Sequence, residues 1–157
     1  MRGGSVPASN DFASPTSAAV LDNAETAIRK GTLNWRKQFM SENLCWTSAE
    51  VAEESSSRAT NRAAIASRWA KEKKIFSVRF EGQHWFPRFQ FQDGGPIPAV
   101  AQVIKVFPGH ATGWELAYFF ATPNPHIGGR KPIELLKGDP SRLLSLAQAF
   151  AHPADVF

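Results

Sequence analysis

The segment that could most readily do chemistry is PNPHIGGRKPIELL, residues 123–136, because closely spaced glycines beside an arginine are typical of loops that bind phosphate. Such loops follow a strand and lead into a helix, often with the spacing G-x-x-x-x-G-K-[ST]. This segment follows a helical pattern and lacks that spacing. Gly128 and Gly129 suit any tight turn, Asn124 can hydrogen-bond neighbouring backbone, and the prolines restrict the unfolded chain. We therefore expect a rigid loop that presents a surface.

The other residue types that catalyse reactions or bind metals are scattered. The histidines, His84, His110, His126 and His152, have no metal-ligand spacing, and no paired carboxylates lie near them. His126 lies in the loop, where a backbone hydrogen bond explains it better than a role as a catalytic base. The single cysteine, Cys45, excludes an internal disulfide and is expected to be a small buried side chain. We expect neither an enzyme nor a bound cofactor or metal.

Basic side chains concentrate in the middle of the chain. The net charge is +4, and residues 44–91 carry eight basic and five acidic side chains, whereas residues 92–157 are balanced. A basic segment can contact the phosphates of DNA. The candidate DNA-binding residues are Arg62, Arg68, Lys71, Arg79 and Arg88. A solvated basic face on a structural domain would explain the same pattern, and the sequence does not decide between the two.

The beginning of the chain predicts a disordered arm followed by helix. Residues 1–16 are rich in glycine, serine and proline and offer little apolar surface, so we expect them to be disordered. From Ser17 onward, apolar residues recur at helical spacing, and the pattern predicts an amphipathic helix that ends at Gly31. A second short helix is predicted from Leu33 to Met40.

No apolar run is long enough to cross a membrane and no secretory signal is visible, so we expect a cytoplasmic protein.

Two helices are predicted in the middle of the chain. The capping-box sequence TSAE predicts a helix over about residues 48–55. After the serine-rich break SSSRATN, a second helix is predicted over about residues 62–74, with Asn61 as its N-cap. Ile65 and Trp69 share one face of this helix, and small and cationic residues occupy the opposite face.

A β-hairpin is predicted after these helices. IFSVRF and HWFPRFQF alternate apolar and polar residues on either side of Glu81-Gly82-Gln83, as a hairpin requires. Arg79 and Arg88 are expected to project from it. Two helices and a hairpin predict a small winged-helix, or helix-turn-helix-like, unit within a helical region spanning residues 17–91.

The remaining residues, 92–157, predict a small helical domain that ends in a tail. Helices are expected from about Pro98, from Thr112 and from Asp139-Pro140, with a short one from Pro132 through Leu136. The run LAYFFA in the second helix is apolar on nearly every side, so this helix must be buried, and a small domain would bury it partly against a partner. The expected fold class is therefore mostly α with one hairpin.

Trp114, the segment PNPHIGGRKPIELL and the leucine-rich last helix resemble the C-terminal toxin-binding domain of the Xre/MbcA/ParS antitoxin family. This resemblance covers roughly residues 96–150. WTSAEVAEE, RWAKEKKIFSVRF and WFPRFQF are similar to the reduced helix-turn-helix and hairpin half of ParS-like members, so about two thirds of the chain is covered. SSSRATNRAAIA departs from a tight helix-turn-helix turn of three or four residues, which makes toxin binding a firmer expectation than operator binding.

The resemblance implies an antitoxin that binds a RES-domain toxin, an enzyme that consumes NAD or transfers its ADP-ribose, and holds it inactive. It implies a homodimer within a toxin–antitoxin hetero-oligomer, operator DNA as a further partner through autorepression, and no membrane. The C-terminal end, AHPADVF, would occlude the NAD pocket of the toxin. The implied toxin-binding residues are Trp114, Asn124, Gly128, Gly129, Arg130, Asp155 and Phe157.

A second interpretation stays open. The same elements suit a free-standing winged-helix transcription regulator whose C-terminal helices only dimerise. This interpretation predicts sequence-specific DNA binding through Arg68 and Lys71, whereas the first predicts inhibition of a partner protein through the C-terminal half.

Overall fold

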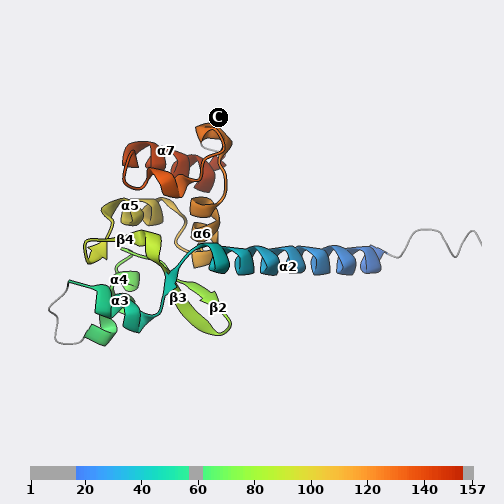
Figure 1. The fold of residues 1–157 in the computed structure, drawn as a ribbon. Helices are drawn as coiled ribbons and strands as arrows, with labels where there is room; N and C mark the ends of the chain where they lie inside the picture. The colour runs from blue at the N-terminus through green and yellow to red at the C-terminus, as the bar shows by residue number, and fades with distance from the viewer. Residues whose placement is uncertain (1–16, 57–61, 154–157) are drawn as a thin grey trace, which may run out of the picture. The chain divides into compact units, whose positions relative to one another are not determined.

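The computed structural model describes residues 17–56 and 62–153 (Figure 1). The arm expected over residues 1–16 lies outside these ranges. The chain divides into two compact units, residues 1–37 and 38–157, and the helix α2, Ser17–Glu42, runs across the division. The described residues are mostly helical with a small β component, as the sequence predicts.

The prediction that Gly31 ends the first helix is wrong. α2 continues through Gly31 without a left-handed residue, and it includes the segment that was expected to form a second helix. A glycine in a helix interior costs only about 1 kcal/mol relative to alanine. Because the residues on both sides are helical, that cost is too small to end the helix at this position.

α3, Ser48–Glu54, begins as predicted, whereas the next helix begins later. The Thr47 hydroxyl accepts from the Glu50 amide at 3.2 Å, and the Glu50 carboxylate accepts from the Thr47 amide at 3.1 Å. A 3-10 turn, η1 (Arg62–Ala64), precedes α4, Ile65–Lys71. The expected N-cap, Asn61, lies outside the described residues, and the helix-turn-helix assignment stays a prediction.

The end of α4 also comes earlier than predicted. Lys73 has a left-handed backbone with φ of 60°, its amide donates to Ala70 O at 3.1 Å, and the Lys74 amide donates to Trp69 O at 2.9 Å. These two hydrogen bonds form a Schellman motif, which satisfies the last helical carbonyl groups and turns the chain away. Since lysine at this position gives no sequence signal for such a cap, the helix was predicted too long.

The hairpin is present and belongs to a three-stranded sheet. β2, Val78–Phe80, pairs with β3, Gln83–Pro87, across Glu81 and Gly82, whose φ angles of 53° and 76° match a type I′ turn. The sheet order is β1-β3-β2, because β1, Cys45–Trp46, pairs with the other edge of β3. β1 was missed because two residues are too few to show an alternating pattern.

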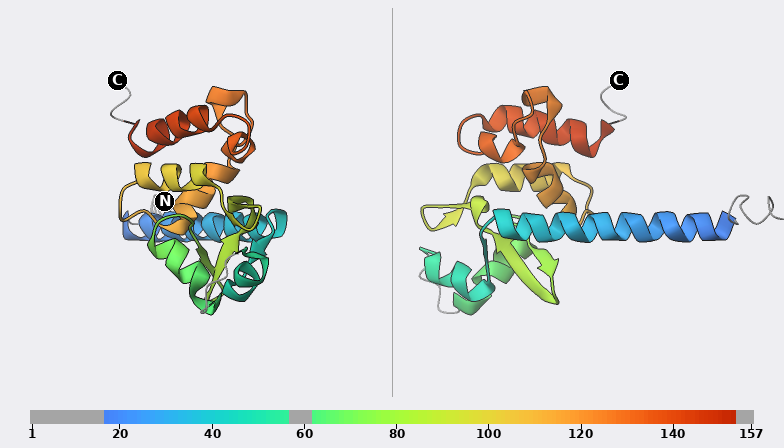
Figure 2. Two further views of the ribbon diagram at one scale, coloured as in Figure 1. Left: turned by 90° about the vertical axis from the view of Figure 1, so that its left-hand side faces the viewer. Right: turned by 45° about the vertical axis from the view of Figure 1, so that its right-hand side comes forward.

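The remaining elements follow the hairpin directly. A 3-10 turn, η2 (Arg88–Gln90), leads into a second small hairpin that the sequence did not reveal, formed by β4 (Phe91–Gln92) and β5 (Gly95–Pro96). The later elements are the helices α5 (Pro98–Val106), α6 (Gly113–Ala121) and α7 (Pro140–Ala151) and the 3-10 turns η3 (Pro125–Ile127) and η4 (Pro132–Leu135). The helices start where they were predicted, and α7 lies along α5 (Figure 2).

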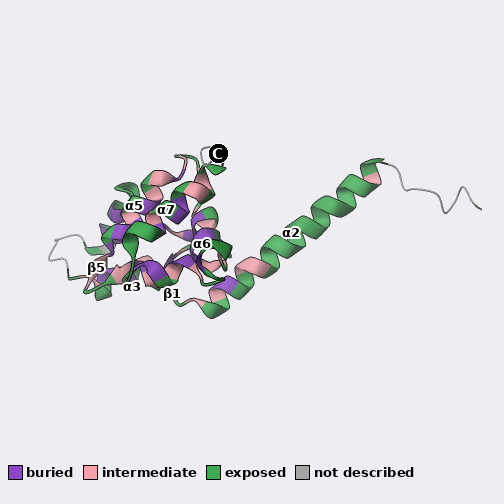
Figure 3. Ribbon diagram, turned by 90° about the horizontal axis from the view of Figure 1, so that it is seen from above, coloured by how far each residue is buried: buried purple, intermediate pink, exposed green. Residues whose placement is uncertain are grey.

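The core of residues 38–157 joins the segments on both sides of residue 91. One cluster comprises Val51, Ile65, Ala66, Trp69, Ile75 and Phe86. Phe76, which precedes the hairpin, stacks on Phe120 of α6 with ring centroids 5.9 Å apart, and Phe89 lies 5.2 Å from the same ring. Figure 3 shows the buried residues, in purple, distributed over several helices of this unit.

The buried side-chain amide of Gln90 connects separate segments of this core. The Gln90 side chain is fully buried; its oxygen accepts from the Phe76 amide at 2.7 Å, and its nitrogen donates to Phe76 O at 2.9 Å and to Pro87 O at 3.1 Å. The Gln90 backbone carbonyl accepts from the Ile97 amide at 2.8 Å. Gln90 thus connects the segment after α4, the end of β3 and the start of α5.

We expect Gln90→Ala to lower the free energy of unfolding by about 4 kcal/mol, because it opens a cavity and leaves buried backbone groups of Phe76 and Pro87 without partners. Urea denaturation followed by circular dichroism measures the change. Gln92→Ala, at an exposed position of β4, is the matched control and should change stability by less than about 0.5 kcal/mol. Equal effects of the two substitutions would contradict a special role for Gln90.

Candidate partner-binding surface

The loop that follows α6 is closed by its own hydrogen bonds. The Asn124 side chain accepts from the His126 amide at 2.9 Å, as expected for an asparagine in a turn. The Asn124 backbone donates to Arg130 O at 2.9 Å and accepts from the Gly129 amide at 3.0 Å. Gly128 and Gly129 have φ angles of 68° and 82°, which glycine adopts without strain. The backbone of the loop is therefore fixed at both ends.

The loop is also attached to α7. The Arg142 guanidinium donates to His126 O at 3.0 Å, while the Asp139 carboxylate caps α7 by accepting from the Arg142 amide at 3.2 Å. Ile127 is buried beneath the loop, and Arg130 is exposed with its Nε donating to Ile127 O at 3.4 Å. His126 thus contributes to the loop through its backbone amide and carbonyl groups.

Trp114 lies at the opposite end of α6 from this loop. Its indole Nε1 donates to Arg79 O at 2.9 Å, and its ring meets Phe39 edge-on at 5.6 Å and Phe80 at 6.4 Å. A Cβ added at Gly113 would collide with Ser77 O, so only glycine permits α6 to start this close to the sheet. Trp114 therefore holds the unit together, and the structure does not bring it beside Asn124, Gly128, Gly129 and Arg130.

An exposed pair of aromatic rings lies near the end of α7. Tyr118 of α6 and Phe150 of α7 are 45% and 43% exposed, and their ring centroids are 6.3 Å apart. Phe150 also contacts Phe107 at 5.9 Å and Phe119 at 5.3 Å. Tyr118 and Phe150 together are called the aromatic patch below. Sequence reasoning did not place either residue in a site, although for Tyr118 the all-round apolar character of LAYFFA was a signal.

Phe150 of the aromatic patch lies one residue before the end of α7, where the C-terminal tail begins. α7 ends at Ala151, and the His152 ring nitrogen Nε2 lies 2.7 Å from Val106 O at the end of α5. Asp155 and Phe157, which the family resemblance assigned to toxin binding, lie outside the described residues.

The five candidate DNA-binding cations have different environments. Arg62 donates to Ala52 O of α3, and the Arg88 guanidinium lies 5.7 Å from the centre of the Trp46 ring, so both side chains make contacts within the unit. Arg68 and Lys71 lie on the exposed face of α4, and Arg79 is exposed on β2. The exposed face of α4 thus carries two of the five.

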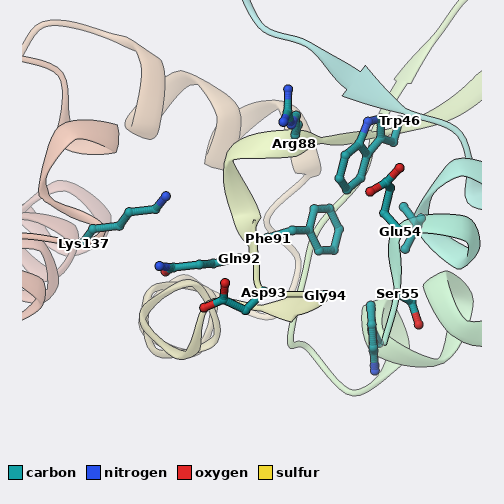
Figure 4. Close-up of a pocket in the computed structure, with 11 residues that line it drawn as sticks. Trp46, Glu54, Ser55, Arg88, Phe91, Gln92, Asp93, Gly94 and Lys137 are labelled. Atoms are coloured by element: carbon teal, nitrogen blue, oxygen red, sulfur yellow. The ribbon is translucent and has the colours of Figure 1, made fainter. Parts of the chain in front are cut away.

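A cavity of about 290 Å³ lies beside Arg88 (Figure 4). Trp46 stacks on Phe91 at 5.3 Å in its wall. A neighbouring hollow of about 480 Å³ shares Arg88, Phe91 and Lys137 with it. Because the first cavity is lined by two cations, Arg88 and Lys137, and by two carboxylates, Glu54 and Asp93, its charge favours neither anions nor cations.

The nucleophile candidates are weak. Burial raises the pKa of the Cys45 thiol to about 11, so the half-buried thiol is protonated at neutral pH and acts as a packing group. Ser77 Oγ lies 3.2 Å from His84 Nδ1 on the exposed side of the hairpin, and neither residue lines the two cavities. Among residues 17–56 and 62–153, no group of histidine, cysteine and carboxylate side chains could hold a metal ion.

Comparison with models of known protein families, with curated proteins and with solved structures finds no match to this chain. Within the described ranges, none of the helices combines the length and the apolar character that crossing a membrane requires.

Proposed function

We propose that this chain is the antitoxin of a type II toxin–antitoxin system, and that it binds and inhibits a RES-domain toxin that consumes NAD or transfers ADP-ribose. The proposal rests on the family resemblance of residues 96–150. The structural observation that supports it best is the aromatic patch of Tyr118 and Phe150. Two large rings exposed side by side are typical of the anchors of protein interfaces, which are rich in tyrosine and other aromatic residues.

The position of the aromatic patch suits the proposed mode of inhibition. A partner that covers Tyr118 and Phe150 meets the end of α7, from which the tail continues. The tail would then enter the NAD pocket of the toxin, and the catalytic chemistry would belong to the toxin alone. The fixed loop that contains Asn124, Gly128, Gly129 and Arg130 would supply further contacts through its exposed backbone and the Arg130 side chain.

We expect Tyr118→Ala to weaken binding to the toxin at least about 30-fold, on the order of 2 kcal/mol, because it removes an anchor that is buried only in the complex. Titration calorimetry with the purified product of the adjacent reading frame measures the affinity. Leu44→Ala, which changes a 59% exposed side chain outside α6 and α7, should leave the affinity unchanged. Loss of affinity in both variants, or in neither, would contradict the assignment of the patch.

We expect deletion of residues 154–157 to reduce neutralisation more than assembly, because the tail acts on the NAD pocket whereas the patch holds the complex together. Intracellular NAD and viability are measured after expression of the toxin alone, with the full chain and with the shortened chain. Co-purification measures assembly. A shortened chain that protects cells as well as the full chain would remove the tail from the mechanism.

A second candidate function is DNA binding, which the exposed cations Arg68 and Lys71 on α4 favour. If α4 contacts phosphates, Arg68→Ala and Lys71→Ala should each reduce the salt dependence of binding by about one released counterion. Fluorescence anisotropy with the DNA upstream of the gene, at several salt concentrations, measures this. Lys105→Ala, on α5, is the charge-matched control. Equal affinity in all variants would exclude α4 as the DNA contact.

A further inference from the structure

One face of α2 is apolar and exposed. Leu21, Ala24, Ile28 and Gly31 recur at intervals of three, four and three residues, which places them on one side of the helix. All four are exposed, Leu21 by 62% and Ile28 by 68%, and Val20 beside them by 48% (Figure 3). These four residues are called the α2 seam. The charged side chains of α2 lie off this seam.

Among the residues of the seam, Gly31 is the one whose identity is hardest to explain from α2 alone. It lies in the interior of α2, where glycine is less favourable than alanine by about 1 kcal/mol. It has no left-handed backbone, and a Cβ added to it would meet no described atom within 4 Å. Neither the backbone conformation nor packing within the described residues requires a glycine here. A glycine on an exposed apolar face instead allows a helix of another molecule to approach closely.

The acidic and basic side chains of α2 are separated along the seam. Asp22 and Glu25 precede Arg29 and Lys30, Arg36 and Lys37 follow, and Glu42 ends the helix. The ion pair between Glu25 and Arg29, at 3.1 Å, joins side chains that are 61% and 76% exposed, so both stay accessible to another molecule. Over the stretch that contains the seam, acidic residues therefore precede basic ones, and such a stretch is complementary to itself when reversed.

We propose that the α2 seam binds a second copy of this chain in antiparallel orientation. With the two helices crossing at the level of Thr26, Leu21 of one copy faces Gly31 of the other, and Ala24 faces Ile28. Each large side chain then meets a small one, which allows close packing. The same register sets Glu25, which flanks the seam, beside Arg29 of the partner copy.

A parallel pair would lack both kinds of complementarity. Leu21 would face Leu21, the two Gly31 residues would leave a gap, and Glu25 would lie level with Glu25 of the other copy instead of near Arg29. A second copy is favoured over an unrelated helix because size and charge complementarity are both present within this one sequence. This pairing is independent of the toxin and of DNA, so it holds or fails separately from the proposed function.

The test is the mass of the full chain by sedimentation equilibrium over a range of concentrations. We expect two chains for the unmodified protein and, for Ile28→Glu, a dissociation constant raised at least about tenfold, because a charge would be placed in the seam. Leu33→Glu introduces the same charge on the opposite side of α2 at a position that is 47% exposed, and it should keep the dimer. Because glutamate favours helix more than isoleucine does, loss of the dimer would not reflect a weaker helix.

A single-chain mass for the unmodified protein at all concentrations would overturn the proposal, and so would equal effects of the two glutamate substitutions. Orientation is tested by oxidative cross-linking in a Cys45→Ala background, with the two copies tagged to different lengths. A mixture of Ala24→Cys and Ile28→Cys chains should give mainly the mixed disulfide. Preferential linking of Ala24→Cys chains to one another would indicate a parallel pair and overturn the antiparallel register.

Discussion

The side-chain amide of Gln90 is the interaction on which the compact unit of residues 38–157 depends. A polar group in a fully buried position destabilises the fold unless its hydrogen-bonding groups find partners, and Gln90 finds three, all of them backbone groups. Because these partners are backbone groups of Phe76 and Pro87, the Gln90 amide determines the path of the backbone as well as the stability of the fold. The stacking of Phe76 on Phe120, and through it the position of α6, follows from where Gln90 holds Phe76.

The positions of α6 and α7 determine which side chains remain available for partners. α6 is anchored at its start by Trp114 and Gly113, and the loop after it is attached to α7 by Arg142. Between these attachments the helix buries Leu116, Ala117, Phe119 and Phe120, which leaves Tyr118 outward. The outward direction of Tyr118 is thus a consequence of helical geometry, since four of its neighbours are needed for the core.

The sequence predicts those parts of the fold that depend on local sequence patterns. The capping box at Thr47, the glycine turn at Gly82 and the starts of α5, α6 and α7 are local signals, and the structure has these features where they were expected. The errors arise where a distant contact or a backbone conformation decides. Lys73 adopts a left-handed conformation without being glycine, and β1 exists because β3 lies beside it.

The candidate site was predictable only in part, for the same reason. The bonds that close the loop around Asn124 follow from its own sequence, whereas the separation of Trp114 from that loop depends on the length of α6. Phe150 lies on the apolar stripe of α7, and its sequence gives no sign that the core leaves this ring 43% exposed. The pairing of Tyr118 with Phe150 joins residues from two helices, which no local pattern contains.

The type I′ turn at Glu81 and Gly82 bears on the order in which the unit folds. Its backbone twist matches that of the two strands, and the pairing partners are only a few residues apart, so the turn can close on the microsecond scale of isolated hairpins. The bond from Trp114 to Arg79 spans 35 residues and that from His152 to Val106 spans 46, so both require much longer loops to close. If the hairpin forms first, the backbone carbonyl groups of Ser77 and Arg79 are already in place when the first residues of α6 dock against them. The slow step of folding would then be the docking of the C-terminal helices onto a hairpin that has already formed.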